Sequence, residues 1–210
     1  MIDFTGVSAV QVPEGSVYRI TTASGDVLWE KVDESLEGCT YPDYIKFNAD
    51  MVFDTHIICN QNTKIEVRFT RETSESRYMF GVRSSTNLAT VSVVLTSNGE
   101  WRFGGAYRKL TMSNATTVRN VTMDKSKITF GTSNYTYTGT VGTFTSPYTL
   151  TVGSARQTNG VKAAPEFIGR IYYFRMYDGD KLVLDWIPCK KKDGTLGFYD
   201  NVKRMFVSKL

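Results

Sequence analysis

The sequence is poor in the residues that build metal centres and catalytic triads. It holds one histidine, His56, and three widely spaced cysteines, Cys39, Cys59 and Cys189. No CxxC pair and no Cys/His cluster is present, and such clusters are the usual signature of a zinc site. The odd number and the wide spacing predict free, buried thiols in a reducing compartment rather than a disulfide framework.

Long apolar runs and charge of one sign are also scarce. No stretch approaches the ~20 apolar residues that span a bilayer. The N-terminal segment MIDFTGVSAVQVPEGSVYRI lacks the basic start and apolar centre of a secretion signal. We therefore expect synthesis in a cytoplasm and no membrane insertion. The 25 basic and 21 acidic residues are spread along the chain and give a net charge of +4, which argues against a nucleic-acid partner.

The residues that are abundant indicate β-structure. The 17 glycines and 13% aromatic residues in 210 positions fit one sandwich of short strands joined by tight turns. From Tyr44 onward the apolar pattern has a period of two. In KIEVRFT, Ile65, Val67 and Phe69 fall on one face. TVSVVLTSNGEWRFGG predicts a hairpin with a two-residue turn at Asn98-Gly99.

The same rhythm continues to the C-terminus. SKITFGTSNYTYTGTV predicts a hairpin around 131–134, PYTLTVGSAR predicts a strand, and turns are expected at 178–180 and 193–194. Between them, Ile171, Tyr173 and Arg175 should face one side and Tyr172, Phe174 and Met176 the other. Short alternating strands with regular turn signals predict an all-β, two-sheet antiparallel sandwich.

The chain divides into three parts in this interpretation. Residues 1–32 form a small N-terminal β unit for attachment and assembly, with strands at Val17–Thr21 and Val27–Val32. An isolated hairpin is marginally stable, so it should pack on the main domain or on another subunit through Trp29. Residues 33–43 read as a polar linker, and residues 44–210 as the sandwich.

Two segments carry a family resemblance. YIKFNADMVFDTHIICNQNTKIEVRF and FIGRIYYFRMYDGDKLVLDWIPCKKKDGTLGFYDNVKRMFV resemble the concanavalin A-like, laminin G-like jelly rolls of phage and prophage tail proteins. The C-terminal features are a Gly-x-Ile-Tyr-x-Phe strand, an Asp-Gly turn, an Ile-Pro-Cys strand and a Gly-x-Tyr-Asp turn. The resemblance covers about residues 40–207, and 84–165 match only in strand rhythm. It implies a virion tail or baseplate component that touches the host surface, often through saccharide.

The residues that carry this resemblance are expected to be architectural. We predict that Gly169 lets strands approach closely and that Pro188 marks a strand end or bulge. Tyr172, Phe174 and Trp186 should fill the space between the sheets, since large aromatic side chains are usually buried.

Catalytic patterns are weak in this sequence. A retaining glycosidase needs two carboxylates about 5–5.5 Å apart, but Glu72 and Glu75 read as loop residues and Asp178 and Asp180 flank a turn glycine. A Ser-His-Asp triad would depend on His56 alone. Calcium could use loop acids, but no EF-hand spacing organises them, and we predict no cofactor and no metal.

Glycan binding is the better-supported prediction. MFGVRSSTN and TVGSARQTNG both run from an apolar strand through glycine and arginine into a polar loop with asparagine. If both ends share one rim, their arginines line a common groove. Loops on a rigid scaffold commonly carry binding residues. The glycan-contact candidates are Arg83, Asn87, Trp101, Tyr107, Arg108, Tyr135, Tyr137, Arg156 and Asn159.

The expected function is therefore a non-enzymatic virion protein of the phage tail or baseplate. It would bind host cell-surface saccharide, contact other tail proteins and form a homo-oligomer, with a trimer favoured. One alternative is a purely structural virion decoration or assembly protein that does not bind glycan. A glycan hydrolase is a further alternative, and release of reducing sugar would identify it.

Overall fold

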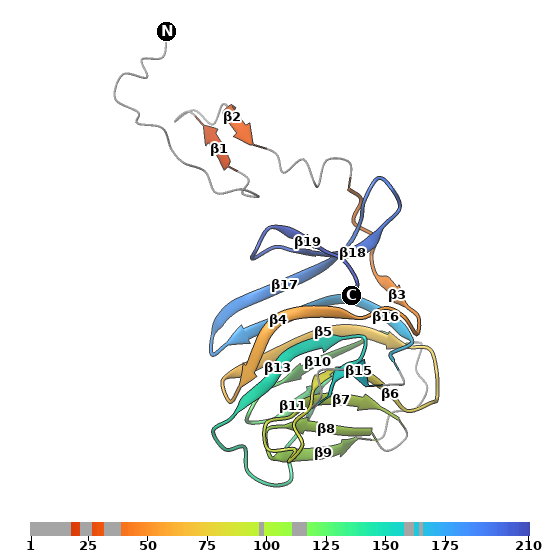
Figure 1. Cartoon of the computed structure of the whole chain (residues 1–210), viewed down its shortest axis with the longest axis vertical. Helices are drawn as coiled ribbons and strands as arrows, with labels where there is room; N and C mark the ends of the chain where they lie inside the picture. The colour runs from red at the N-terminus through yellow and green to blue at the C-terminus, as the bar shows by residue number, and fades with distance from the viewer. Residues whose placement is uncertain are drawn as a thin grey trace, which may run out of the picture.

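The computed structural model describes residues 18–21, 27–31, 39–96, 99–110, 117–157, 162–163 and 166–210 (Figure 1). Within these ranges every regular element is a β-strand, as the sequence predicts. The predicted N-terminal hairpin is present, with β1 (Tyr18–Thr21) antiparallel to β2 (Val27–Lys31). The side chain of Trp29, the expected anchor, lies outside the described part. The division into three parts stays a prediction.

The larger sheet of the main body has nine strands. β16 lies near its middle, flanked by β5 on one side and by β17 and β3 on the other. In sheet order the strands are β12 (Ser133–Tyr135), β11 (Ile128–Phe130), β10 (Arg119–Met123), β5 (Thr63–Arg71), β16 (Gly169–Asp178), β17 (Lys181–Lys190), β18 (Leu196–Asp200) and β19 (Met205–Val207), with β3 (Ile45–Phe47) pairing to the start of β16.

The second sheet has eight strands. All its pairings are antiparallel except a two-residue parallel ladder between β14 and β6. Its strands are β15 (Lys162–Ala163), β14 (Ala155–Arg156), β6 (Arg77–Val82), β7 (Val91–Leu95), β8 (Gly99–Phe103) and β9 (Ala106–Leu110), with β13 (Thr145–Val152) joining β6 to β4 (Phe53–Asn60).

The chain crosses repeatedly between the two sheets. It passes from β3 to β4, back to β5, across to β6–β9, back to β10–β12, across to β13–β15 and back to β16–β19. Consecutive strands thus often lie in different layers, which is the connectivity of a jelly-roll sandwich. The predicted two-sheet fold is confirmed by this topology.

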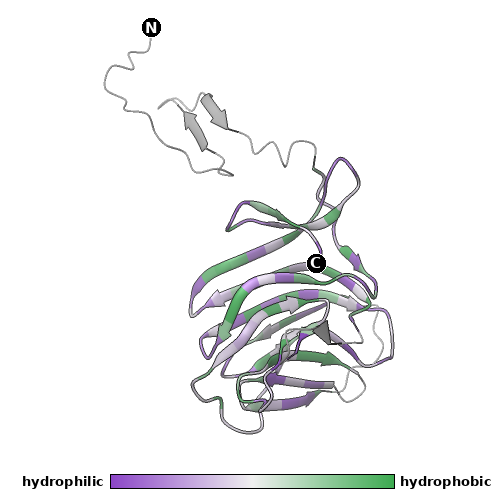
Figure 2. Cartoon of the chain, in the orientation of Figure 1, coloured by the Kyte–Doolittle hydropathy of each residue, from purple (hydrophilic) through white to green (hydrophobic). Residues whose placement is uncertain are grey.

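The core fills the space between the layers. Ile65, Val67 and Phe69 are fully buried, as their alternation predicts, and so are the inward residues of β7 and β8. Figure 2 shows the resulting change of hydropathy along the strands. Trp186 stacks on Phe198 at 5.1 Å between ring centroids, and Phe53 packs on Phe198 at 4.9 Å. Such packed aromatic pairs contribute about 0.5–1.5 kcal/mol each beyond their buried area.

The alternation predicted for 171–176 is wrong after Ile171. Ile171 pairs with Phe69, but Tyr173 pairs with Arg68, so a β-bulge at Tyr172 shifts the register by one residue. Phe174 and Met176 remain buried as predicted. Tyr172 does not enter the core; it lies half-buried with its ring 5.5 Å from that of Tyr44.

Gly169 has the structural role expected of it, whereas the predictions for Pro188 and Gly99 are wrong. A Cβ at Gly169 would lie 2.2 Å from the carbonyl oxygen of Thr70, which confirms the close strand approach. Pro188 lies in β17 beyond its ladder with β16 and pairs with Phe198, and β17 continues past Pro188 to Lys190 without a bulge in its ladder with β18. Gly99 is not in a two-residue turn: it opens β8 and pairs with Leu110, so the connection from β7 is longer than predicted.

Candidate functional site

The two arginine-bearing strand ends lie side by side, as the sequence suggests. The backbone N–H of Arg83 donates to the carbonyl oxygen of Arg156 at 2.8 Å, and Arg156 pairs with Val82 in the β14–β6 ladder. The short parallel ladder therefore joins the end of β6 to β14. Asn159, the fourth residue of the predicted groove, lies outside the described residues.

The two guanidinium groups nevertheless have different partners. Arg156 donates to the Asp54 carboxylate at 2.8 Å and to the Thr149 hydroxyl at 2.8 Å. Arg83 donates to the Tyr78 hydroxyl at 2.8 Å. Because Arg156 is paired with groups on β4 and β13, it does not line the cleft beside Arg83, and the predicted shared groove is wrong in this respect.

A small polar cleft, which we name the rim cleft, remains at Arg83. It has a volume of about 160 Å³ and is lined by Arg83, Ser84, Ser85, Asn87 and Gln157. The loop that forms it is held internally: the hydroxyl of Ser84 accepts from the N–H of Ala89, and that of Thr90 accepts from the N–H of Ser84. The rim cleft is therefore a fixed arrangement of guanidinium, hydroxyl and amide groups.

Two further features shape this loop. Asn87 has φ of 62°, in the left-handed region that asparagine tolerates better than most residues. This conformation turns the chain so that the next residue, Leu88, is 64% exposed. Leu88 lies near Gly105, where a Cβ would be 3.3 Å from its side chain. The loop thus presents an apolar side chain toward the turn between β8 and β9.

Most of the predicted aromatic contacts belong to the core instead. Trp101 is fully buried and contacts Phe130 at 6.0 Å between centroids. Burial raises the pKa of Tyr137, and its hydroxyl has no hydrogen-bond partner. These two assignments as surface contacts are corrected, because the alternation on β8 places Trp101 on the inner face and Tyr137 packs against Phe103.

Arg108 and Tyr135 form a pair near that core. Arg108 lies opposite Trp101 in the β8–β9 ladder, hence on the inner side of the sheet. Its guanidinium lies 5.8 Å from the centre of the Tyr135 ring, and its Nε is buried without a hydrogen-bond partner. Neither residue lines the rim cleft.

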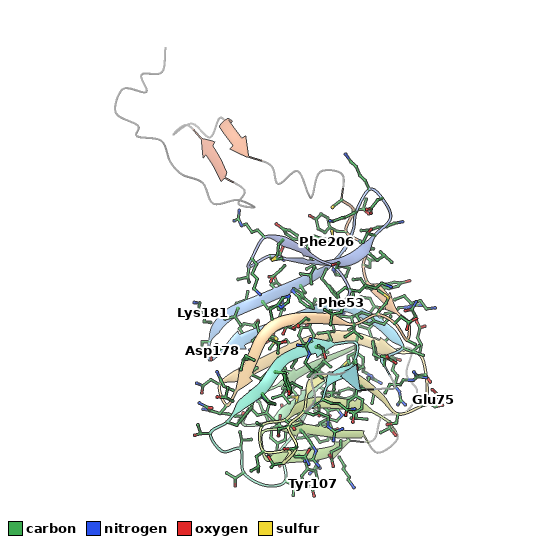
Figure 3. All side chains as sticks on the ribbon, in the orientation of Figure 1. Phe53, Glu75, Tyr107, Asp178, Lys181 and Phe206 are labelled. Atoms are coloured by element: carbon green, nitrogen blue, oxygen red, sulfur yellow. The ribbon has the colours of Figure 1, made fainter. Side chains whose placement is uncertain are left out.

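Tyr107 faces the opposite side of the sheet from Arg108 and also lies far from the rim cleft. It pairs with Arg102, whose guanidinium is 5.6 Å from its ring centre. β9 is three strands from β6, a separation of about 14 Å at the usual spacing of neighbouring strands. Figure 3 shows Tyr107 at the β9 edge of the body. Of the eight predicted contacts that the structure describes, only Arg83 and Asn87 come together in one cleft.

Asp54, the partner of Arg156, is held by several hydrogen bonds. Burial by itself would raise its pKa, but the His56 amide, the Thr149 hydroxyl and the Arg156 guanidinium together hold the pKa below its ordinary value. His56 has φ of 56° and a side chain that is 68% exposed, with Nδ1 3.9 Å from Asp54. The histidine is a surface residue at a bend of β4.

The other acids considered for catalysis are paired or lie at turns. Glu72 bonds to Arg170 at 2.8 Å and to Lys46 at 3.3 Å, and Glu75 pairs with Arg77. Asp178 and Asp180 flank Gly179, whose φ of 59° confirms the predicted turn. Across the described ranges, no three His, Cys, Asp or Glu side chains gather as metal ligands. No helix in the same ranges has the length and apolarity of a membrane span.

A second surface, which the sequence pattern did not predict, lies on the outer face of the nine-stranded sheet. Half-buried tyrosines alternate there with cationic side chains, because the Tyr172 bulge turns Tyr173, Arg175 and Tyr177 outward. We name it the tyrosine face; its residues are Tyr44, Tyr172, Tyr173, Tyr177, Lys64, Arg68, Arg170 and Arg175.

Short contacts order the tyrosine face. Arg170 lies 4.6 Å from the ring centre of Tyr44, Arg175 lies 4.8 Å from that of Tyr173, and Lys64 lies 4.5 Å from that of Tyr177. Two carboxylates hydrogen-bond to residues of this face. Asp185 accepts from Arg175 at 2.7 Å, and Glu66 accepts from the Tyr177 hydroxyl at 3.0 Å. The sequence pattern did not predict this face because of the bulge. A strict period of two assigns Tyr173 and Arg175 to the same face as Ile171, whereas the bulge places them on the opposite face.

Comparison with known proteins finds structural likeness at low sequence identity. A heptameric SAP-like pentraxin from Limulus polyphemus is 9% identical, over 69% of this chain and 76% of its own, with a TM-score of 0.43. Domains LG4–5 of the mouse laminin α1 chain are 12% identical, over 83% of this chain and 49% of theirs, with a TM-score of 0.45. This chain thus spans about half of that laminin fragment. No protein family and no curated sequence matches it.

The class of protein is therefore set by the sheet topology, which is that of a two-layer jelly-roll sandwich. The topology does not test the tail setting, which remains a proposal.

Proposed function

We propose that this protein is a non-enzymatic tail or baseplate component of a phage or prophage virion, made in the bacterial cytoplasm, that binds host cell-surface glycan at the rim cleft. The observation that carries the proposal is the cleft itself, where Arg83 and Asn87, in a loop held by its own hydrogen bonds, lie beside Gln157, which follows β14. The tail setting is supported by the sequence resemblance alone.

The chemistry of the rim cleft suits a sugar. A guanidinium donates to adjacent hydroxyls, and side-chain amides both donate and accept. The volume of about 160 Å³ is below the roughly 300 Å³ of ordinary small-molecule pockets, so each cleft would hold one sugar unit weakly. A homo-oligomer, which we propose to be a trimer, would multiply weak sites into useful avidity.

Binding to an array of bacterial surface saccharides tests this function. We expect Arg83→Ala to lower binding by about tenfold or more, because a charge-assisted hydrogen bond is lost. Tyr78→Phe is the matched control: it removes the hydrogen bond between Arg83 and Tyr78 but keeps the guanidinium, and should retain binding. Equal binding by wild type and Arg83→Ala would refute the proposal.

The tyrosine face favours the second candidate, a structural assembly protein. Tyrosine and arginine are the residues most enriched at protein interfaces, and this face combines four tyrosines with three arginines. Under this hypothesis, Arg68→Ala with Tyr173→Ala should weaken self-association or incorporation into particles while leaving glycan binding intact. Sedimentation of the purified variants separates the two functions.

A further inference from the structure

Two of the three cysteines lie together where the chain enters the sandwich. Thr40 donates its N–H to the Lys190 carbonyl at 2.9 Å, and Lys190 donates its own to the Thr40 carbonyl at 2.8 Å. Cys39 and Cys189 each precede one member of this antiparallel pair. Since successive side chains of a strand alternate between faces, both thiols project from the face opposite Thr40 and Lys190.

The two thiols also contact each other. Their side chains are hydrogen-bond partners, and the Tyr41 hydroxyl lies within electrostatic range of both. Diagonal neighbours in an antiparallel pair have Cα atoms about 7–8 Å apart, whereas a disulfide usually spans up to about 6.8 Å. Thr40–Lys190 is an isolated bridge, so Cys39 needs only a small local adjustment to close the bond.

We propose that Cys39 and Cys189 are a modification site that forms an intrachain disulfide when the protein meets a low-molecular-weight disulfide such as glutathione disulfide. The Cys39 thiolate attacks one sulfur of glutathione disulfide and releases a glutathione thiolate. Cys189 then loses its proton and attacks the Cys39 sulfur of the mixed disulfide, which releases the second glutathione. The two cysteines together lose two electrons and two protons. Glutathione disulfide takes up these electrons and protons and is released as two molecules of reduced glutathione.

Exposure decides the order of these steps. Cys39 is half-buried, whereas Cys189 is fully buried. Burial, together with the hydrogen bond to Cys39, raises the pKa of Cys189 to about 12. Cys39 is therefore the thiol that meets the oxidant, and Cys189 is the resolving thiol. Cys59 serves as an internal control, because it is buried on β4 in the other sheet.

The bond would tie the segment before β3 to β17. It would lock the Thr40–Lys190 pair in place. The thiols stay reduced in a cytoplasm and oxidise outside it, so the tether would close after the protein leaves the cell.

The full chain, equilibrated with excess glutathione disulfide, provides the test. Remaining thiols are alkylated in denaturant, and non-reducing peptide mapping locates the bonds. We expect one alkylated cysteine, Cys59, and one linked peptide pair containing Cys39 and Cys189. Exchange of the Thr40 and Lys190 amides should slow by about tenfold relative to the reduced protein, since local opening is suppressed.

Two variants keep the result interpretable. Cys39→Ser changes a half-buried position, so the protein should fold and show neither the link nor the slowed exchange. Cys59→Ser should leave the link unchanged. Three alkylated cysteines, glutathione retained on Cys39, or a covalent dimer in place of the intrachain link would overturn the proposal.

Discussion

Along β16, aromatic side chains point to both faces of the nine-stranded sheet, and their surroundings differ. On the inner face, Phe174 packs against Phe80 at 5.4 Å and Trp186 at 6.2 Å between centroids and is fully buried. On the outer face, Tyr173 and Tyr177 are half-buried, each beside a cationic group. The inner aromatic side chains stabilise the fold because their rings are buried away from water. The outer tyrosines keep a hydroxyl group that can hydrogen-bond to a partner.

This comparison separates stability from function within one strand. Removing an inner ring leaves a cavity that the packed layers cannot fill. Removing an outer ring exposes neighbours that water already reaches. We therefore expect changes on the inner face to unfold the protein and changes on the outer face or the rim cleft to alter only what it binds.

The largest effect is expected for Trp186→Ala. Its ring stacks on Phe198 and contacts Phe53 and Phe174, so truncation should lower the free energy of unfolding by about 3–5 kcal/mol. Urea unfolding followed by fluorescence or circular dichroism measures it. A loss no greater than that of Tyr173→Ala would break the distinction between the two faces.

Gly169→Ala should come next. The added Cβ would meet the Thr70 carbonyl at 2.2 Å and the Phe167 ring at 2.5 Å, so the strands must separate. Overpacking of this kind costs about 1–3 kcal/mol. Gly142→Ala is the matched control, because a Cβ there meets nothing within 4 Å. Unchanged urea midpoints for both variants would contradict the close strand approach.

Asp54 should make stability depend on pH below its unfolded pKa. Its folded pKa lies below the ordinary 3.8, so the contribution of its carboxylate is complete above that value and is lost as the pH falls through the folded pKa. Asp54→Asn should lower stability by about 1–3 kcal/mol at neutral pH. It should also flatten the fall in urea midpoint as the pH drops below the ordinary pKa of 3.8. A variant as acid-sensitive as wild type would exclude this role.

The smallest change in stability is expected for Arg68→Ala on the tyrosine face. Arg68 is exposed and stacks over Tyr172 at 5.5 Å, so the unfolding free energy should change by no more than about 0.5 kcal/mol. Thermal unfolding measures this effect. A loss above about 1 kcal/mol would show that the outer face contributes to the fold as well as to recognition.

Several elements could be predicted because local pattern decides them. The alternation of Ile65, Val67 and Phe69 fixes which face of β5 is buried, and Asp178-Gly179 supplies the positive φ that its turn requires. The predicted groove required the two similar strand ends to share one rim, and the β14–β6 ladder places Arg156 beside Val82, the residue before Arg83.

The candidate site was less predictable, because side-chain partners come from distant parts of the chain. Arg156 bonds to Asp54, 102 positions away, and this contact removes it from the cleft. The sequence predicts Trp101 as a surface aromatic in a hairpin, yet the nine-stranded sheet covers its face. No local signal distinguishes these outcomes, since each depends on which strand packs opposite.

The sequence by itself determined the all-β class, most strand positions and the turn glycines, because a period of two and backbone sterics act between near neighbours. Tertiary structure alone decided the bulge at Tyr172, the tyrosine face it creates and the meeting of Cys39 with Cys189. Those features arise where strands far apart in sequence pair with each other. Their register depends on the residues of both strands, so neither strand's local sequence determines it alone.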